Sequence, residues 1–158
     1  MSYDFNADEI FLMAEQIERN GAKFYRDSAE GIADPSSKKL LLDLATMEDN
    51  HEKTFSSLRA DLANKEKEPT VFDPEDESIL YLRSLAATRV FFEKDIDTSS
   101  MEEILKSAIG AEKDSIVFYL GMKDLVSETF GKSRIDAIIK EEMQHITLLS
   151  KELIAIKR

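Results

Sequence analysis

Two histidines are present in the sequence, and each ends the same four-residue motif, Glu-x-x-His. The first motif joins Glu48 to His51, and the second joins Glu142 to His145, 94 positions further along the chain. Residues three positions apart lie on one face of an α-helix, with their Cβ atoms about 5–6 Å apart. Each motif can therefore direct a carboxylate and an imidazole toward the same point, which suits a metal ion.

The same offset relates a second kind of pair, a glutamate followed seven positions later by a tyrosine. Glu18 and Tyr25 form the first pair, and Glu112 and Tyr119 form the second. Each half of the chain thus carries Glu, Tyr and then Glu-x-x-His in the same order, which indicates an internal repeat. Four carboxylates and two imidazoles in twofold repetition would suit two metal ions inside a four-helix bundle.

The helical phase of these residues distinguishes them from ordinary glutamates, which are normally exposed to solvent. Glu48 lies seven positions after Leu41 and seven before Phe55, so it falls in the middle of an apolar stripe. His51 falls in the same stripe, and the other candidate residues lie among apolar residues in the same way. Buried carboxylates repel one another and are costly to desolvate, and two divalent cations would offset both effects.

Mixed oxygen and nitrogen ligands suit iron, with manganese as a competitor, and zinc would also bind in vitro. We therefore predict two Fe ions per chain. The predicted metal-binding residues are Glu18, Glu48, His51, Glu112, Glu142 and His145. Two interpretations of Tyr25 and Tyr119 stay open: they are core aromatic residues, or they donate hydrogen bonds to the metal-binding carboxylates.

The composition predicts one folded, mainly helical domain over residues 1–158. The chain is 42% hydrophobic and 34% charged, and its length suffices for a buried core. Its five glycines and three prolines are few, which favours long helices over a turn-rich β fold. The sequence contains no cysteine, which excludes a disulfide, a thiolate metal site and an iron–sulfur cluster within it.

The net charge of the chain limits the kinds of partner that it can bind. A formal net charge of −11 argues against binding to nucleic acid or to an anionic membrane. No apolar stretch approaches the roughly 20 residues of a membrane-spanning helix. The first residues show no basic segment followed by an apolar run, so we expect no signal peptide and a cytoplasmic location.

The distribution of helical patterns predicts an all-α fold with four long helices. We expect one helix pair over residues 6–64, a crossover over residues 65–98 and a second helix pair over residues 99–158. Asp34 is expected to cap the second helix, and Ser99 is expected to form a capping box with Glu102 at the start of the third.

The crossover is too long for a tight hairpin but suits a connection to the far end of a bundle. We expect a short helix within it, beginning near Asp73. Its predicted apolar face consists of Ile79, Leu80, Leu82, Leu85 and Ala86.

The combined pattern resembles the rubrerythrin-type branch of the ferritin-like superfamily. Residues 17–25 are similar to the first helix of those proteins, residues 111–119 are similar to the third, and the two Glu-x-x-His motifs complete the set. The resemblance implies a ferritin-like bundle with a di-iron carboxylate site. It further implies that Glu18 and Glu112 are terminal ligands, that Glu48 and Glu142 bridge the two irons, and that His51 and His145 each bind one iron.

The sequence departs from the family pattern in two respects. Rubrerythrins proper carry a rubredoxin-like tail with four cysteines, and this sequence contains none. They also often carry an extra glutamate three residues beyond the third-helix ligand, where this chain has Ser115. The lack of the cysteine-containing tail removes a built-in electron donor. The serine at position 115 bears on the carboxylate–histidine ligand exchange that is associated with peroxide reduction.

The resemblance implies a non-haem di-iron oxidoreductase that reduces hydrogen peroxide or dioxygen with electrons from an external donor such as rubredoxin. A ferroxidase or iron-handling protein is the first alternative. A metal-stabilised bundle and an oxygenase acting on an organic substrate are the further alternatives. We also expect a homodimer or a higher oligomer.

Overall fold

The computed structural model describes residues 7–65, 80–82, 84–85, 98–126 and 131–158, and every regular element in these ranges is an α-helix. The four long helices are α1 (Ala7–Glu30), α2 (Pro35–Lys65), α4 (Met101–Leu125) and α5 (Lys132–Ile156). This arrangement confirms the prediction of an all-α bundle.

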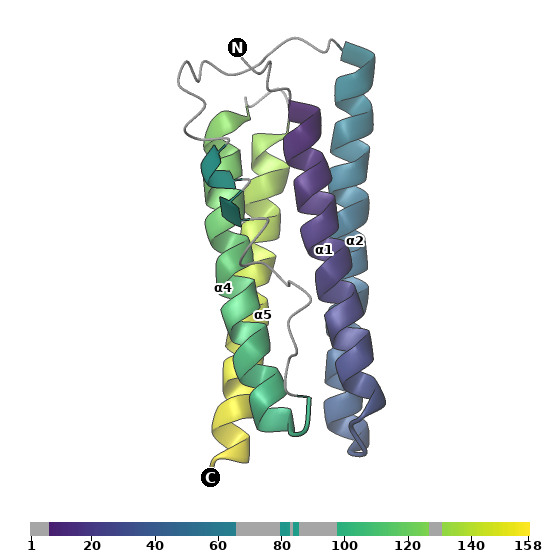
Figure 1. The fold of residues 1–158 in the computed structure, drawn as a ribbon, viewed down its shortest axis with the longest axis vertical. Helices are drawn as coiled ribbons and strands as arrows, with labels where there is room; N and C mark the ends of the chain where they lie inside the picture. Colours follow the sequence, from purple (N-terminus) through teal and green to yellow (C-terminus); the bar gives the residue numbers. More distant parts are fainter. Residues whose placement is uncertain (1–6, 66–79, 83, 86–97, 127–130) are drawn as a thin grey trace.

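The helices form two antiparallel pairs, α1 with α2 and α4 with α5, which lie side by side in Figure 1. Between the pairs, α1 contacts α4 and α2 contacts α5. Helix α2 ends at one end of the bundle and α4 begins at the other (Figure 1). The two helix ends that the predicted crossover connects therefore lie at opposite ends of the bundle.

The short helix predicted in the crossover falls partly within the described residues. Residues 80–82 and 84–85 are helical. Leu82 is fully buried and packs on α4 at Gly121, where an added Cβ would lie 3.2 Å from Leu82 Cδ2. Leu80 is exposed, so its assignment to the buried face is wrong. Ile79 and Ala86 lie outside the described residues.

The starts of α2 and α4 are fixed by side-chain caps. Asp34 accepts a hydrogen bond from the backbone N–H of Ser37 at 2.9 Å, and Pro35 is the first residue of α2, as predicted. Helix α4 is capped by Ser100, whose hydroxyl accepts a hydrogen bond from Glu103 N. The predicted cap at Ser99 is therefore wrong by one residue, because it is Ser100 that adopts the extended backbone of an N-cap.

The start of α5 requires glycine for two reasons. Gly131 has a φ of 100°, which is in the left-handed region that favours glycine. A Cβ at this position would also lie 2.5 Å from Leu58 Cδ2 of α2. The turn into α5 therefore lies directly against the Leu58 side chain of α2.

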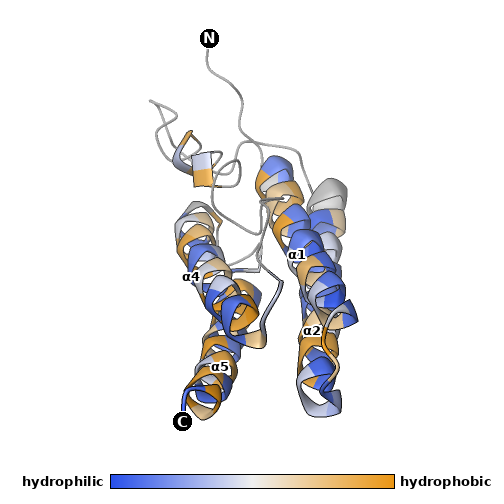
Figure 2. Cartoon of the chain, turned by 60° about the horizontal axis from the view of Figure 1, so that its bottom comes forward, coloured by the Kyte–Doolittle hydropathy of each residue, from blue (hydrophilic) through white to orange (hydrophobic). Residues whose placement is uncertain are grey.

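Each helix carries both hydrophobic and hydrophilic residues, as Figure 2 shows. The hydrophobic residues turn inward at helical spacing and form one core of buried side chains. The buried residues of α5 illustrate the pattern: Ile135, Ile138, Ile139, Glu142, His145 and Leu149. No helix among the described residues is long and apolar enough to cross a membrane.

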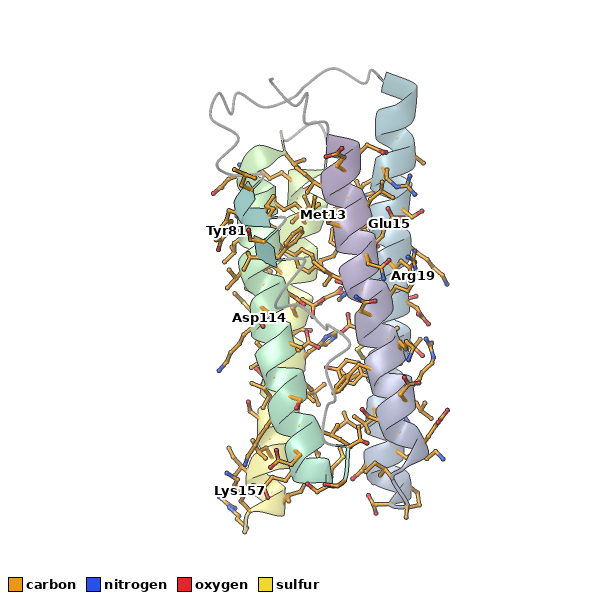
Figure 3. The ribbon with its side chains drawn as sticks, viewed as in Figure 1. Met13, Glu15, Arg19, Tyr81, Asp114 and Lys157 are labelled. Carbon is orange, nitrogen blue, oxygen red and sulfur yellow. The ribbon has the colours of Figure 1, made fainter. Side chains whose placement is uncertain are left out.

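Ion pairs between α1 and α2 reinforce the first helix pair. Glu15 and Arg19 both extend from α1 beside α2 in Figure 3. Arg59 binds Glu15 at 2.6 Å, and Glu15 is almost completely buried. Arg19 binds Glu52 of α2 at 2.7 Å. These contacts hold α1 and α2 in a fixed register, which positions the ligand-type residues of both helices.

Candidate metal centre

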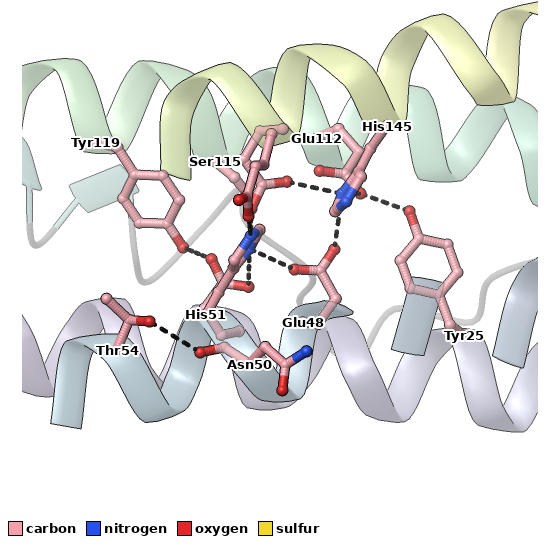
Figure 4. A network of polar contacts seen from close by, with 12 residues as sticks. Tyr25, Glu48, Asn50, His51, Thr54, Glu112, Ser115, Tyr119 and His145 are labelled. Carbon is pink, nitrogen blue, oxygen red and sulfur yellow. Dashed lines mark hydrogen bonds and ion pairs between the residues drawn. The ribbon is translucent and has the colours of Figure 1, made fainter. Parts of the chain in front are cut away.

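All six residues predicted to bind metal meet in the middle of the bundle, and all six are at most 2% exposed. They come from all four long helices, as Figure 4 shows for the polar network. The structure sorts them into two overlapping groups, in each of which one ligand-type atom per residue lies within 4.8 Å of the others. The first group is Glu18, Glu48, His51 and Glu142, and the second is Glu48, Glu112, Glu142 and His145.

The two groups share the glutamates of the Glu-x-x-His motifs. Glu48 and Glu142 belong to both groups, whereas each remaining glutamate and each histidine belongs to one. This sharing follows from the helix geometry, because Glu48 and Glu142 face each other across the α2–α5 contact. Two carboxylates are thus placed where each could serve two neighbouring cations.

Both imidazoles direct Nδ1 toward the shared carboxylates. His51 Nδ1 lies 2.8 Å from Glu142 Oε1 and 3.5 Å from Glu18 Oε2. His145 Nδ1 lies 3.3 Å from Glu142 Oε2 and 3.4 Å from Glu112 Oε1. The two rings are stacked, with their centroids 5.6 Å apart. The site therefore offers one nitrogen donor to each group of carboxylates.

The two tyrosines cross between the halves of the bundle. Tyr25 of α1 donates a hydrogen bond to Glu112 of α4 at 2.6 Å, and Tyr119 of α4 donates one to Glu18 of α1. Burial raises the pKa of Tyr25, and the charge of Glu112 raises it further. Burial and the charge of Glu18 raise the pKa of Tyr119 in the same way. Both phenols therefore stay protonated and hold one oxygen of the partner carboxylate.

The donor atoms of the site fit cations. Six buried ligand-type atoms make no hydrogen bond of regular geometry within the described part of the chain, although His51 Nδ1 and Glu142 Oε1 lie close together. All six belong to the two groups. These atoms are Glu48 Oε1, Glu112 Oε2, Glu142 Oε1, Glu142 Oε2, His51 Nδ1 and His145 Nδ1. Leaving a buried donor or acceptor unsatisfied costs about 1–3 kcal/mol. The set of oxygen and imidazole donors is one that transition metals bind, which gives these atoms the partners they lack.

The glutamates of the two motifs hold protons unusually strongly. Burial raises the pKa of Glu48 well above its ordinary value, and the charges of Glu18 and Glu142 raise it further. Burial, followed by the charges of Glu18 and Glu112, raises the pKa of Glu142 in the same way. The ionised form of a carboxyl group is disfavoured when the group is buried in a low-dielectric environment beside other carboxylates. A divalent cation would compete with these protons for the same oxygens.

In the two histidines and Glu112, contacts with neighbouring groups outweigh the effect of burial on the pKa. Burial alone would lower the pKa of His145, but its contacts with Glu112 and Glu142 raise it to about 12. The pKa of His51 is raised as well, because its contacts with the carboxylates outweigh burial. Burial would raise the pKa of Glu112, but contacts with Glu142, His145 and Tyr25 lower it to about 2. The cluster thus gathers positive charge against its carboxylates, which is the charge a metal pair would supply.

One residue of the site was not predicted from the sequence. Glu141 of α5 lies 2.5 Å from His51 Nε2 of α2 through its carboxylate. Its side chain is 55% exposed, and it lies beside the apolar stripe of α5 and not within it. Helical phase alone therefore gave no signal for it. The one available signal was its place directly before Glu142 in the motif.

Ser115 lies within the site, three residues after Glu112, and is buried (Figure 4). Its hydroxyl donates a hydrogen bond to the carbonyl oxygen of Ala111 at 3.0 Å. The side chain is thus bonded to its own helix and adds no carboxylate to the cluster.

A groove of about 790 Å³ between α2 and α5 leads to the histidines. Both imidazoles and Glu141 line it, together with Met47 and Gln144. The groove gives small molecules a route from solvent to the edge of the cluster.

The fold and the cluster together define a four-helix bundle protein with a buried carboxylate and histidine site that suits two metal ions. The model of the rubrerythrin family matches residues 9–153, and the chain belongs to this family. No curated protein matches the sequence.

Two solved structures are similar to the fold. A Thermotoga maritima protein, described as a ferritin-like diiron-carboxylate protein, is 24% identical and has a TM-score of 0.68. The match covers 94% of this chain and 95% of that one. A hypothetical protein from Pyrococcus furiosus is 22% identical, with a TM-score of 0.66 and coverage of 97% and 91%.

Proposed function

We propose that this protein is a non-haem di-iron oxidoreductase that reduces hydrogen peroxide or dioxygen. The observation that carries the proposal is the pair of overlapping Glu and His groups that share Glu48 and Glu142. Membership of the rubrerythrin family and likeness to a protein described as a diiron-carboxylate protein support it. Iron is the proposed metal, with manganese or zinc as substitutes.

Each group would hold one iron. Glu18 and His51 would bind one iron, Glu112 and His145 would bind the other, and Glu48 and Glu142 would help to hold both. When bound, the irons would supply electrons to a small oxidant and stabilise charge that develops on it. Tyr25 and Tyr119 hold Glu112 and Glu18 in place through their hydrogen bonds. The apolar residues around the cluster exclude bulk water, and the α2–α5 groove admits small molecules.

The proposed reaction needs an external source of electrons. The sequence contains no cysteine, so the chain itself provides neither a rubredoxin-type centre nor a thiol donor. Reduction of one peroxide molecule to two water molecules takes two electrons and two protons. We propose that a redox protein such as rubredoxin supplies the electrons and that the protons come from solvent.

Ser115 favours one alternative, a ferroxidase that oxidises iron during iron handling. Ser115 has no carboxylate that could take part in a ligand exchange, and its hydroxyl is bonded to the carbonyl oxygen of Ala111. Peroxide turnover would then be slower than in a rubrerythrin with the extra glutamate, whereas oxidation of ferrous iron would not depend on that residue.

Stopped-flow oxidation of the di-ferrous protein tests the proposal. Peroxide and dioxygen are mixed separately with protein that was loaded with Fe(II) under anaerobic conditions. We expect one rapid oxidation, followed by arrest until reduced rubredoxin is added. Retention of more than two irons per chain would favour the ferroxidase. Reaction with neither oxidant would contradict both functions and leave a structural role for the metal.

Assembly as a homodimer or a higher oligomer also remains a proposal. Large hydrophobic side chains are exposed on α2 and α5, which supports it. They include Leu42, Met47, Met143 and Leu148. Analytical ultracentrifugation at several concentrations measures the state directly, and a monomer throughout would refute assembly.

A further inference from the structure

The twofold repeat of the chain is broken beside the metal centre at the residue directly before each motif glutamate. Every cluster residue and both tyrosines have a counterpart 94 positions away. The residue that precedes the motif glutamate does not: it is Met47 in the first half and Glu141 in the second. The two halves therefore support their histidines differently.

Glu141 contacts the ring nitrogen of His51 that points away from the cluster. Its carboxylate lies 2.5 Å from His51 Nε2, and the His51 side chain is only 3% exposed. The carboxylate can only accept, so the Nε2–H of His51 donates this bond. With Nε2 engaged, the lone pair of the neutral ring lies on Nδ1, which faces Glu18 and Glu142. Glu141 thus fixes the tautomer and the orientation that metal binding through Nδ1 requires.

His145 has no comparable support. Its Nδ1 faces Glu112, Glu142 and Glu48, but none of the described residues accepts a hydrogen bond from its Nε2. The position equivalent to Glu141 holds Met47, which lines the same groove as His145 and carries no acceptor of comparable strength. The His145 ring is therefore held by packing and by the cluster alone.

We propose that Glu141 makes the two metal positions unequal, so that the position containing His51 binds metal more tightly than the one containing His145. This inference rests on the proposed two-metal site. A carboxylate hydrogen-bonded to a ligand imidazole increases its basicity and orients it, and loss of such a partner typically lowers metal affinity about 10- to 100-fold. Glu141 is a positioning residue, because it acts on the metal through His51.

A weaker interpretation is that Glu141 and His51 form an ordinary surface ion pair, which contributes little. The geometry argues against it, because the imidazole of this pair is only 3% exposed, although the Glu141 side chain is 55% exposed. The bond is also directional, since it engages the nitrogen opposite the one that faces the cluster. The two interpretations make different predictions for metal affinity.

Anaerobic titration of the apoprotein with Co(II), followed by its visible absorption, tests the inference without any measurement of activity. We expect the wild-type protein to bind two ions in two separated steps. Glu141→Gln should weaken the tighter step about 10- to 100-fold. Met47→Glu, which restores the repeat, should strengthen the weaker step and bring the two together. Glu152→Gln removes one negative charge from the same helix, α5, and should leave both steps unchanged.

Proton NMR of the Zn(II)-loaded protein gives an independent readout. We expect a downfield, slowly exchanging Nε2–H resonance from His51 that moves upfield in Glu141→Gln. A wild-type protein that binds both ions with equal affinity, or a Glu141→Gln variant with unchanged affinities and an unchanged resonance, would overturn the inference. Failure of the wild-type protein to bind any metal would instead refute the proposed function on which the inference rests.

Discussion

The two halves of the bundle repeat their ligand-type residues but differ in what surrounds them. The α1–α2 pair is joined by three sets of charged contacts within the described residues. They are Arg19 with Glu52, Arg26 with Asp49, and Arg59 with Glu15 and Asp8. The α4–α5 pair is joined by Lys123 with Asp136 at 2.8 Å and by Lys157 with Glu102 at 3.7 Å. The 94-residue repeat thus relates the residues of the cluster but not the charged residues on the outside of the two helix pairs.

This difference indicates which residues cannot be replaced without disturbing the metal centre. Each cluster residue contacts residues of the other half, so replacing one leaves buried partners without charge compensation. Apart from the buried Glu15, the residues of these charged contacts are partly exposed to solvent, where ion pairs typically contribute less than about 1 kcal/mol. Met47 and Glu141 lie between the buried cluster and the exposed outer faces. The two halves carry different residues at this position, and we expect the difference to affect metal binding.

The largest expected effect is the loss of a shared glutamate. Glu48→Ala removes a ligand from both groups, so the paired metal site should be lost. Glu18→Ala removes a ligand from one group and should mainly weaken one metal. If the halves are equivalent at the cluster, Glu142→Ala should match Glu48→Ala. Iron per chain, measured by elemental analysis after anaerobic loading, distinguishes these outcomes. Two irons retained in Glu48→Ala would contradict the shared role.

Removal of the metal should destabilise the fold, and more so as pH rises. The raised pKa values of Glu48, Glu142, His51 and His145 mean that the folded apoprotein binds more protons than the unfolded chain. The stability from these groups is present below their unfolded pKa values, near 4.3 for Glu and 6.5 for His, and is lost above them. Each extra proton changes the free energy of unfolding by up to about 1.4 kcal/mol per pH unit.

Metal binding has the opposite pH dependence, because the ligands must lose their protons. The melting-temperature difference between holoprotein and apoprotein should therefore grow between pH 5.5 and pH 8. The lowered pKa of Glu112 acts only below about pH 4, outside this range. Differential scanning calorimetry across the range measures the difference. Equal melting temperatures at every pH would contradict a buried metal centre.

A smaller effect on stability should distinguish the ion pairs that join α1 to α2 from those that join α4 to α5. Arg59→Met leaves the buried carboxylate of Glu15 without its ion pair, and should lower the free energy of unfolding by about 1–3 kcal/mol. Lys123→Met breaks the exposed pair with Asp136 in the other half and should cost less than about 1 kcal/mol. Urea denaturation of the holoprotein measures both. Equal losses would show that the two helix pairs are stabilised alike.

The smallest effect concerns the tyrosines and tests the equivalence of the halves at the cluster. Tyr25→Phe removes the hydrogen bond to Glu112, and Tyr119→Phe removes the bond to Glu18. Each change should weaken the metal position of its partner glutamate by about 1 kcal/mol, which is roughly fivefold. Co(II) titration should therefore show that Tyr25→Phe affects the His145 position and Tyr119→Phe the His51 position. Effects on the opposite positions would contradict the crossed pairing.

The cluster could be predicted from the sequence because helical phase is a local property. Glu48 and His51 lie at heptad spacing from apolar residues, so their burial follows from the α2 sequence alone. The crossed hydrogen bonds of Tyr25 and Tyr119 depend on which helices face each other, and the sequence does not state this. Glu141 was missed for a similar reason, because its partner His51 lies across the α2–α5 contact.

The fold was predicted with errors at its boundaries. The cap of α4 lies one residue beyond the predicted Ser99, because adjacent serines offer two similar caps and the backbone selects Ser100. In the crossover, Leu82 packs on α4 but Leu80 faces solvent. Periodicity in a short segment does not fix which side faces the bundle, whereas four long helices with a 94-residue repeat define the bundle well.

The most direct test of the two-metal centre is the metal content of the protein purified from iron-replete cells, together with anaerobic rebinding of Fe(II) to the apoprotein. The overlapping groups around Glu48 and Glu142 predict two irons per chain, with a separation of about 3.5–4 Å by X-ray absorption spectroscopy. An apoprotein that binds no Fe(II), or a single iron without a metal neighbour, would contradict the account.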